Sequence, residues 1–132
     1  MNFDLVIFDC DGVLIDSELL SVRADIACFA EAGITITADE IGDRYIGISQ
    51  AAMEADIVAR YGQALPDDFA ARHRRCLREI FEAELAPMPG VEAVLDALPC
   101  PACVASSSSP ERLSHALALV GLYDRLCPHL RC

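Results

Sequence analysis

The chain has 132 residues with a formal net charge of −11, and 54% of its residues are hydrophobic. This length suits one domain of ordinary size. The excess of acidic residues disfavours nucleic acids and anionic membranes as partners, because both repel a negatively charged protein. No apolar run approaches the ~20 residues of a membrane-spanning helix, and the acidic N-terminus does not resemble a secretory signal, so we expect a cytoplasmic protein. All ten Lys and Arg positions are arginine, which excludes chemistry by a Schiff-base or P-loop lysine within this sequence.

Hydrophobic periodicity and turn residues predict a strand, four helices, a further helix, a second strand and a last helix. Residues 3–8 form a short apolar run that is typical of a buried parallel strand. Capping residues and glycine stops mark several helix ends. The remaining elements are expected at 17–32, 38–43, 50–61, 66–84 and 91–98 for helices, 101–105 for the second strand, and 110–120 for the last helix.

This order predicts an α/β fold with a Rossmann-like parallel sheet. The helices between residues 17 and 86 contain no strand. We therefore expect them to form an inserted subdomain, while residues 1–16 and 87–132 form the sheet-bearing part.

Two aspartates, Asp9 and Asp11, follow the first strand directly. In parallel sheets, ligands bind beyond the carboxyl ends of the strands. Two carboxylates there suit a hard cation such as Mg²⁺, and one of them can act as a nucleophile while the other transfers protons. The alternative is a turn whose acids only cap the next element.

The run VIFDCDGVLIDSE at residues 6–18 resembles the first signature of the haloacid dehalogenase superfamily. The resemblance implies that Asp9 is the nucleophile and that Asp11 protonates the leaving group and then activates water. It also implies that the Asp9 carboxylate and the Asp11 main-chain carbonyl bind Mg²⁺, and that Gly12 and Val13 begin a flap over the site. An acid at position 11 favours phosphoester hydrolysis over carbon–halogen cleavage, and the lack of lysine disfavours the phosphonate-cleaving branch.

The run VASSS at residues 104–108 resembles the second signature of the superfamily. By this resemblance, Ser106 hydrogen-bonds the transferred phosphoryl group, and Ser107 assists. A polar turn followed by a helix cap is the alternative for the same residues.

The helical block 17–86 resembles the cap of this superfamily, inserted into a core of residues 1–16 and 87–132. Within it, the segment RYIGIS at residues 44–49 resembles the cap loop that reads the substrate. The resemblance implies substrate contacts by Arg44, Gly47, Ser49 and Gln50, although Arg44 also suits a solvated surface. Gln50 stands where phosphoglucomutase-like members carry arginine, which favours a phosphatase over a phosphosugar mutase.

Two further family signatures have no counterpart in this sequence, namely a lysine and a late acidic pair. We therefore expect a truncated or frame-shifted chain with impaired catalysis. Its core is expected to keep two parallel strands, whose bare edges invite self-association.

The expected function is a Mg²⁺-dependent phosphatase that acts on a small phosphorylated metabolite, such as a sugar phosphate or a phosphogluconate-like compound, through an aspartyl-phosphate. The alternatives are a non-catalytic or partner-dependent fragment, a phosphosugar mutase, and a zinc module. The zinc module would be formed by members of the set Cys100, Cys103, Cys127, His129 and Cys132.

Overall fold

The computed structural model describes residues 3–126 and divides the chain into two compact units. One unit contains residues 1–20 and 80–132, and is called the sheet unit here. The other contains residues 21–79, and is called the helical unit. These limits lie a few residues inside the predicted boundaries at 16/17 and 86/87, within two long helices.

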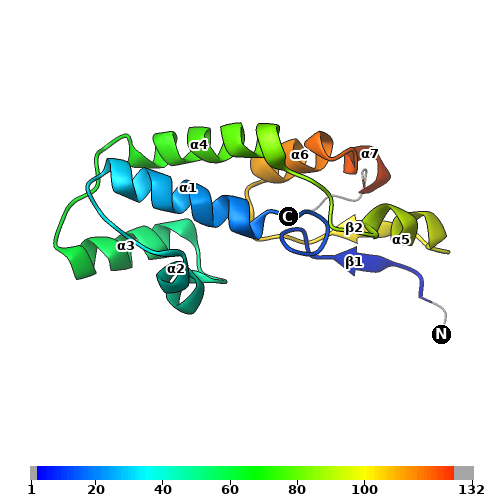
Figure 1. The fold of residues 1–132 in the computed structure, drawn as a ribbon. Coiled ribbons are helices and arrows are strands. Elements are labelled where there is room, and N and C mark those ends of the chain that lie inside the picture. The colour runs from blue at the N-terminus through cyan, green and yellow to red at the C-terminus, as the bar shows by residue number, and fades with distance from the viewer. Residues whose placement is uncertain (1–2, 127–132) are drawn as a thin grey trace. The chain divides into compact units, whose positions relative to one another are not determined.

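The sheet unit is built on two parallel strands, β1 (Val6–Phe8) and β2 (Ala102–Val104), which lie side by side in Figure 1. Val6 pairs with Ala102, and Phe8 pairs with Val104. The predicted α/β class with a parallel sheet is confirmed, and the described sheet has two strands.

Helices pack around this pair of strands within the same unit. They are α5 (Val91–Ala97), α6 (Pro110–Leu119) and α7 (Tyr123–Leu126), together with the first turn of α1 (Glu18–Glu31) and the last turn of α4 (Phe69–Glu84). The fully buried core includes Leu14, Ile15, Val104, Leu113, Leu117, Leu122 and Leu126. Leu14 and Ile15 belong to residues 1–20, and the others belong to residues 80–132. The core therefore contains side chains from both segments of the sheet unit.

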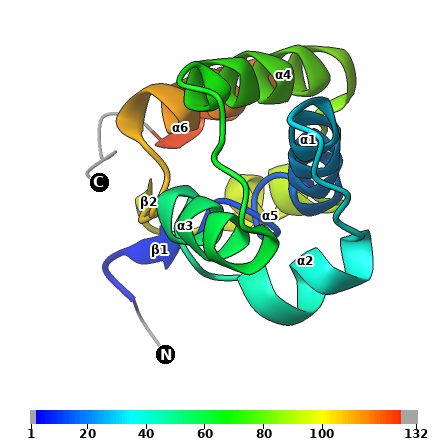
Figure 2. The same ribbon diagram turned by 90° about the vertical axis from the view of Figure 1, so that its left-hand side faces the viewer.

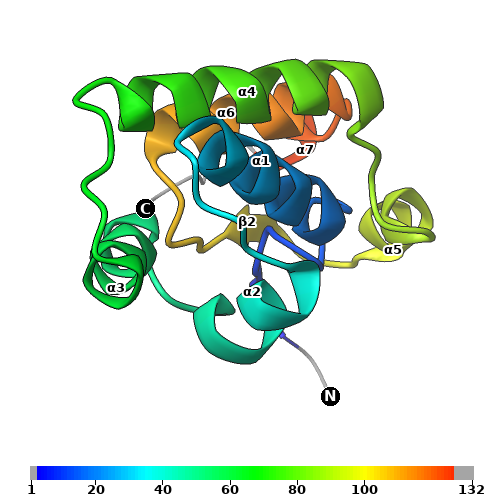
Figure 3. The same cartoon turned by 60° about the vertical axis from the view of Figure 1, so that its left-hand side comes forward.

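The helical unit contains most of α1 and α4 with α2 (Ala38–Tyr45) and α3 (Gln50–Tyr61). Figure 2 shows α2 and α3 as neighbours, and Figure 3 shows the extended connection from α3 to α4. Its core is a cluster of buried apolar side chains centred on Phe29 and Ile57. The rings of Phe29 and Phe69 pack with centroids 4.9 Å apart, which ties α1 to α4.

All six predicted helices are present in the predicted order within the described residues, with small shifts at their ends. α3 has the predicted bounds: Ser49 caps it by accepting from the Ala52 N–H at 3.2 Å, and Gly62 ends it at φ +64°. α4 begins at Phe69 instead of residue 66, and both strands are shorter than predicted. The four-residue helix α7 was not predicted. No helix within residues 3–126 is both long and apolar enough to cross a membrane.

Candidate active site

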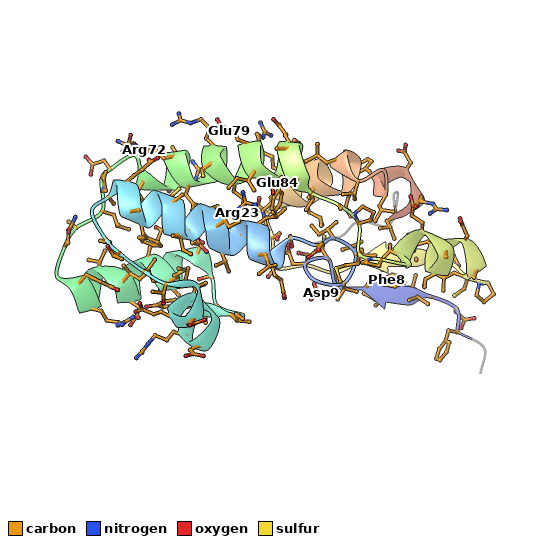
Figure 4. The ribbon with its side chains drawn as sticks, viewed as in Figure 1. Phe8, Asp9, Arg23, Arg72, Glu79 and Glu84 are labelled. Atoms are coloured by element: carbon orange, nitrogen blue, oxygen red, sulfur yellow. The ribbon has the colours of Figure 1, made fainter. Side chains whose placement is uncertain are left out.

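Asp9 lies at the carboxyl end of β1, directly after Phe8, as Figure 4 shows. The Phe8 carbonyl accepts from the Ala105 N–H at 2.9 Å, so this end of β1 is fixed to the end of β2. The Asp9 side chain is exposed, and its Oδ1 accepts from the Cys10 N–H at 2.7 Å. The carboxylate is therefore held by its own backbone and remains open to a ligand.

The five residues after Cys10 form a tight turn. The Cys10 carbonyl accepts from the N–H groups of Leu14 at 2.9 Å and Ile15 at 3.2 Å, and the Gly12 N–H donates to the Ile15 carbonyl at 2.9 Å. Gly12 has φ +72°, and a Cβ there would lie 2.9 Å from Glu18 Oε1. The left-handed backbone favours glycine at this position, and a Cβ would also make the end of the Glu18 side chain move. Val13, the predicted flap residue, is 45% exposed.

Asp11 is half-buried and accepts hydrogen bonds at both carboxylate oxygens. Its Oδ1 accepts from Ser17 Oγ at 2.6 Å and from Arg112 Nη2 at 3.0 Å. Its Oδ2 accepts from Ser108 Oγ at 3.2 Å and from Arg112 Nη1 at 3.4 Å. Asp11 therefore points at the start of α6, whereas Asp9 is free of such partners in the described residues.

The predicted phosphoryl-binding serines lie in the turn between β2 and α6. Ser106 is half-buried, and its Oγ accepts from the Ser108 N–H at 3.1 Å. Ser107 is exposed. The serine of this turn that contacts Asp11 is Ser108, which no signal in the sequence distinguished from its neighbours. The roles of Ser106 and Ser107 stay predictions.

Cys10 lies between the two aspartates in sequence, but its thiol is a poor nucleophile. Burial raises the pKa of the Cys10 thiol to about 12, the neighbouring Asp11 and Asp9 carboxylates raise it as well, and Arg112 lowers it in part. The thiol remains protonated near neutral pH, and only a thiolate is a good nucleophile. The carboxylate of Asp9 is therefore the better nucleophile of this turn.

The predicted substrate-reading residues all belong to the helical unit. Arg44 is exposed near the end of α2, and Gly47 adopts φ +80° in open space, so that a Cβ at this position would meet no atom within 4 Å. Ser49 caps α3, and the Gln50 amide donates to Asp25 Oδ1 at 3.4 Å. Gln50 is thus engaged inside its own unit. Contact of these residues with a substrate stays a prediction.

The donors at this turn fit Mg²⁺ in their chemistry, because the Asp9 carboxylate and the Asp11 carbonyl are oxygen ligands of the kind that this ion prefers. Within residues 3–126, no three His, Cys, Asp or Glu side chains are grouped closely enough to hold a metal. Of the alternative zinc ligands, Cys100 and Cys103 are free thiols. Cys127, His129 and Cys132 lie outside the described residues.

Comparison with known proteins gives consistent matches along the chain. A sequence model of the haloacid dehalogenase-like hydrolases matches residues 3–132. A 6-phosphogluconate phosphatase from Escherichia coli is 30% identical over 122 residues, which are 92% of this chain and 55% of that protein. The chain therefore spans about half the length of the curated relative it matches.

Solved structures match the fold over nearly the whole chain. A haloacid dehalogenase-like protein from Agrobacterium tumefaciens has a TM-score of 0.83 and 32% identity, and the match covers 98% of this chain and 58% of that one. A hydrolase of the same family from Deinococcus radiodurans, solved with phosphate and sodium bound, has a TM-score of 0.73 and 26% identity, with 98% and 57% covered. Together with the turn around Asp9 and Asp11, these matches show that the chain belongs to the haloacid dehalogenase-like hydrolase family.

Proposed function

We propose that this chain carries the nucleophile and the proton-transfer group of a Mg²⁺-dependent phosphatase that acts on small phosphorylated metabolites. The observation that carries the proposal is the exposed Asp9 carboxylate at the carboxyl end of β1, beside a second carboxylate, Asp11, that is held by hydrogen bonds. The phosphate bound to the related Deinococcus hydrolase supports a phosphate-binding site in this family.

The proposed reaction has two steps. An Asp9 oxygen attacks phosphorus and forms an aspartyl-phosphate, while Asp11 gives its proton to the departing alkoxide oxygen. Water then attacks the phosphorus, Asp11 takes the proton of that water, and Asp9 is released with inorganic phosphate. Ser106 and Ser107 hydrogen-bond the phosphoryl oxygens, and the exposed Val13 with Gly12 forms the flap that limits access of water.

Mg²⁺, held by the Asp9 carboxylate and the Asp11 carbonyl, would neutralise the charge that gathers on the phosphoryl oxygens. Arg44, Gly47, Ser49 and Gln50 are proposed to read the rest of the substrate. The E. coli relative acts on 6-phosphogluconate, which supports a sugar-phosphate or phosphogluconate-like substrate. The described cysteines are free thiols, which supports a reducing compartment such as the cytoplasm.

The test is hydrolysis of p-nitrophenyl phosphate and 6-phosphogluconate with and without Mg²⁺, in the wild type and in Asp9→Asn. We expect turnover that needs Mg²⁺ and that falls by several orders of magnitude in the variant, because the amide cannot attack phosphorus. Asp39→Asn, at an exposed aspartate of α2, is the matched control and is expected to keep full activity.

Mg²⁺-independent turnover that survives Asp9→Asn would contradict the proposal. An absence of turnover in every preparation would favour the alternative that these residues act only with a partner or a further segment. Because the described sheet leaves one edge of β1 unpaired, we also infer that this edge can associate with a second copy of the chain.

A further inference from the structure

Arg112 makes the most extensive contact with Asp11 among the described residues, and nothing in the two family signatures includes it. Nη2 of Arg112 donates to Asp11 Oδ1 at 3.0 Å, and Nη1 lies 3.4 Å from Oδ2. Nη1 also donates to Ser108 Oγ, and that hydroxyl in turn lies 3.2 Å from Oδ2. Arg112 thus reaches both carboxylate oxygens, one directly and the other mainly through Ser108.

The two oxygens of Asp11 are held unequally. Oδ1 has two short contacts, at 2.6 Å from Ser17 Oγ and 3.0 Å from Arg112. Oδ2 has two long ones, at 3.2 Å from Ser108 and 3.4 Å from Arg112. Both lengths lie beyond the usual ranges of about 2.5–3.0 Å for O–H···O and about 2.7–3.2 Å for N–H···O hydrogen bonds. Oδ1 is therefore the more tightly held oxygen of the two.

The guanidinium of Arg112 packs over an aromatic ring. Its Cζ lies 5.4 Å from the centroid of the Phe81 ring, and Nε is buried without a hydrogen-bond partner among the described residues. Arg112 also occupies the first turn of α6, the end of a helix where the backbone dipole disfavours a cation. Helix stability does not explain an arginine there, whereas the Asp11 carboxylate beside it does.

We propose that Arg112 is a positioning residue for Asp11: it anchors Oδ1 and leaves Oδ2 to pass the proton to the leaving oxygen and to take it back from water. This inference rests on the proposed phosphatase function for its kinetic part. Arg112 does not touch the substrate in this scheme, and it acts only through Asp11. Its loss is expected to lower the rate of the chemical step and to leave substrate binding almost unchanged.

The kinetic test compares Arg112→Gln and Arg112→Lys with the wild type on p-nitrophenyl phosphate. We expect kcat to fall by about 10- to 100-fold in Arg112→Gln, within the range that a displaced acid–base group costs, while KM changes by less than about twofold. Lysine keeps the charge but lacks the two-pronged geometry, so Arg112→Lys is expected to recover part of kcat. Arg125→Gln, which removes the surface pair with Asp96, is the control and is expected to keep the wild-type kcat.

Two kinetic results would overturn the proposal. An unchanged kcat in Arg112→Gln would mean that Asp11 needs no anchor. A large rise in KM with kcat preserved would mean that Arg112 binds the phosphate itself instead of Asp11.

A second test needs no turnover. Thermal unfolding of Asp11→Asn, Arg112→Gln and the double variant forms a double-mutant cycle. If Arg112 holds Asp11, the double variant loses less Tm than the sum of the two single losses. Additive losses would overturn the proposal whatever the activity. A chain that shows the non-additive result but hydrolyses no phosphate ester would favour the partner-dependent alternative to the proposed function and leave the Arg112–Asp11 anchor supported.

Discussion

The turn after Asp9 depends on one residue that has no side chain. Gly12 combines a left-handed backbone, at φ +72°, with a close approach to the end of the Glu18 side chain. The same turn carries Asp11 and Val13, so its shape determines where the acid–base group and the flap lie. Local sequence shows this requirement, because a glycine after two acids separated by one residue is a turn signal.

Gly12→Ala is therefore expected to destabilise the protein. The positive φ costs a non-glycine residue about 1 kcal/mol or more, and the Glu18 side chain must also move. Gly42→Ala is a matched control, because Gly42 lies inside α2 with no atom within 4 Å of the added Cβ. There alanine is expected to stabilise by about 0.5–1 kcal/mol. Urea unfolding of both variants measures this difference, and a loss of equal size in both would show that the turn does not need glycine.

At the scale of the elements, a buried polar pair joins α1 to α4 within the helical unit. His73 Nε2 and Asp25 Oδ1 are 2.7 Å apart, and both residues are only 7% exposed. The Gln50 amide from α3 adds a contact to the same oxygen at 3.4 Å. Three helices therefore meet at one carboxylate. The neighbouring Phe69 ring stacks on His73 with centroids 6.3 Å apart.

We expect Asp25→Ala to destabilise the protein by about 3 kcal/mol, because it leaves the buried His73 and Gln50 without their acceptor. Arg72→Ala is the control. It removes the exposed ion pairs of Arg72 with Asp68, at 2.7 Å, and with Glu31, at 3.9 Å, and exposed pairs contribute little. Denaturant unfolding followed by circular dichroism measures both. Equal small losses would mean that water replaces the missing partner at this position.

The elements that the sequence predicted well are those with local signals at both ends. Ser49 and Gly62 define α3, and Ser109 defines the start of α6, where its Oγ accepts from the Arg112 N–H at 3.3 Å. α7 has four residues, too few to show a period. Arg112 was missed for a different reason: its contact with Asp11 spans 101 positions of sequence. The sequence near Asp11 and near Arg112 contains no signal that the two residues meet. Their contact follows only from the pairing of β1 with β2.

At the scale of the whole chain, two facts belong together. The chain spans about half the length of its E. coli relative, and its described sheet has two strands. β1 has β2 on one side and no described strand on the other. Apolar side chains on and around β1 are correspondingly exposed: Phe3 at 62%, Leu5 at 45%, Ile7 at 63% and Val94 at 51%. A groove of about 290 Å³ between Phe8, Val13 and α5 extends this apolar surface. An unpaired edge with these surroundings is a template for another strand.

We therefore expect the chain to self-associate through β1, with the same edge of two copies pairing about a two-fold axis. A charge at the centre of an edge strand blocks such pairing, so Ile7→Lys is expected to shift the protein toward monomer in sedimentation velocity across a concentration series. Leu19→Lys is the control, because Leu19 is equally apolar and is 73% exposed on α1, outside the strand. A wild type that stays monomeric at high concentration would contradict association. An equal loss of association in both variants would show that general surface hydrophobicity, and not the edge of β1, holds the copies together.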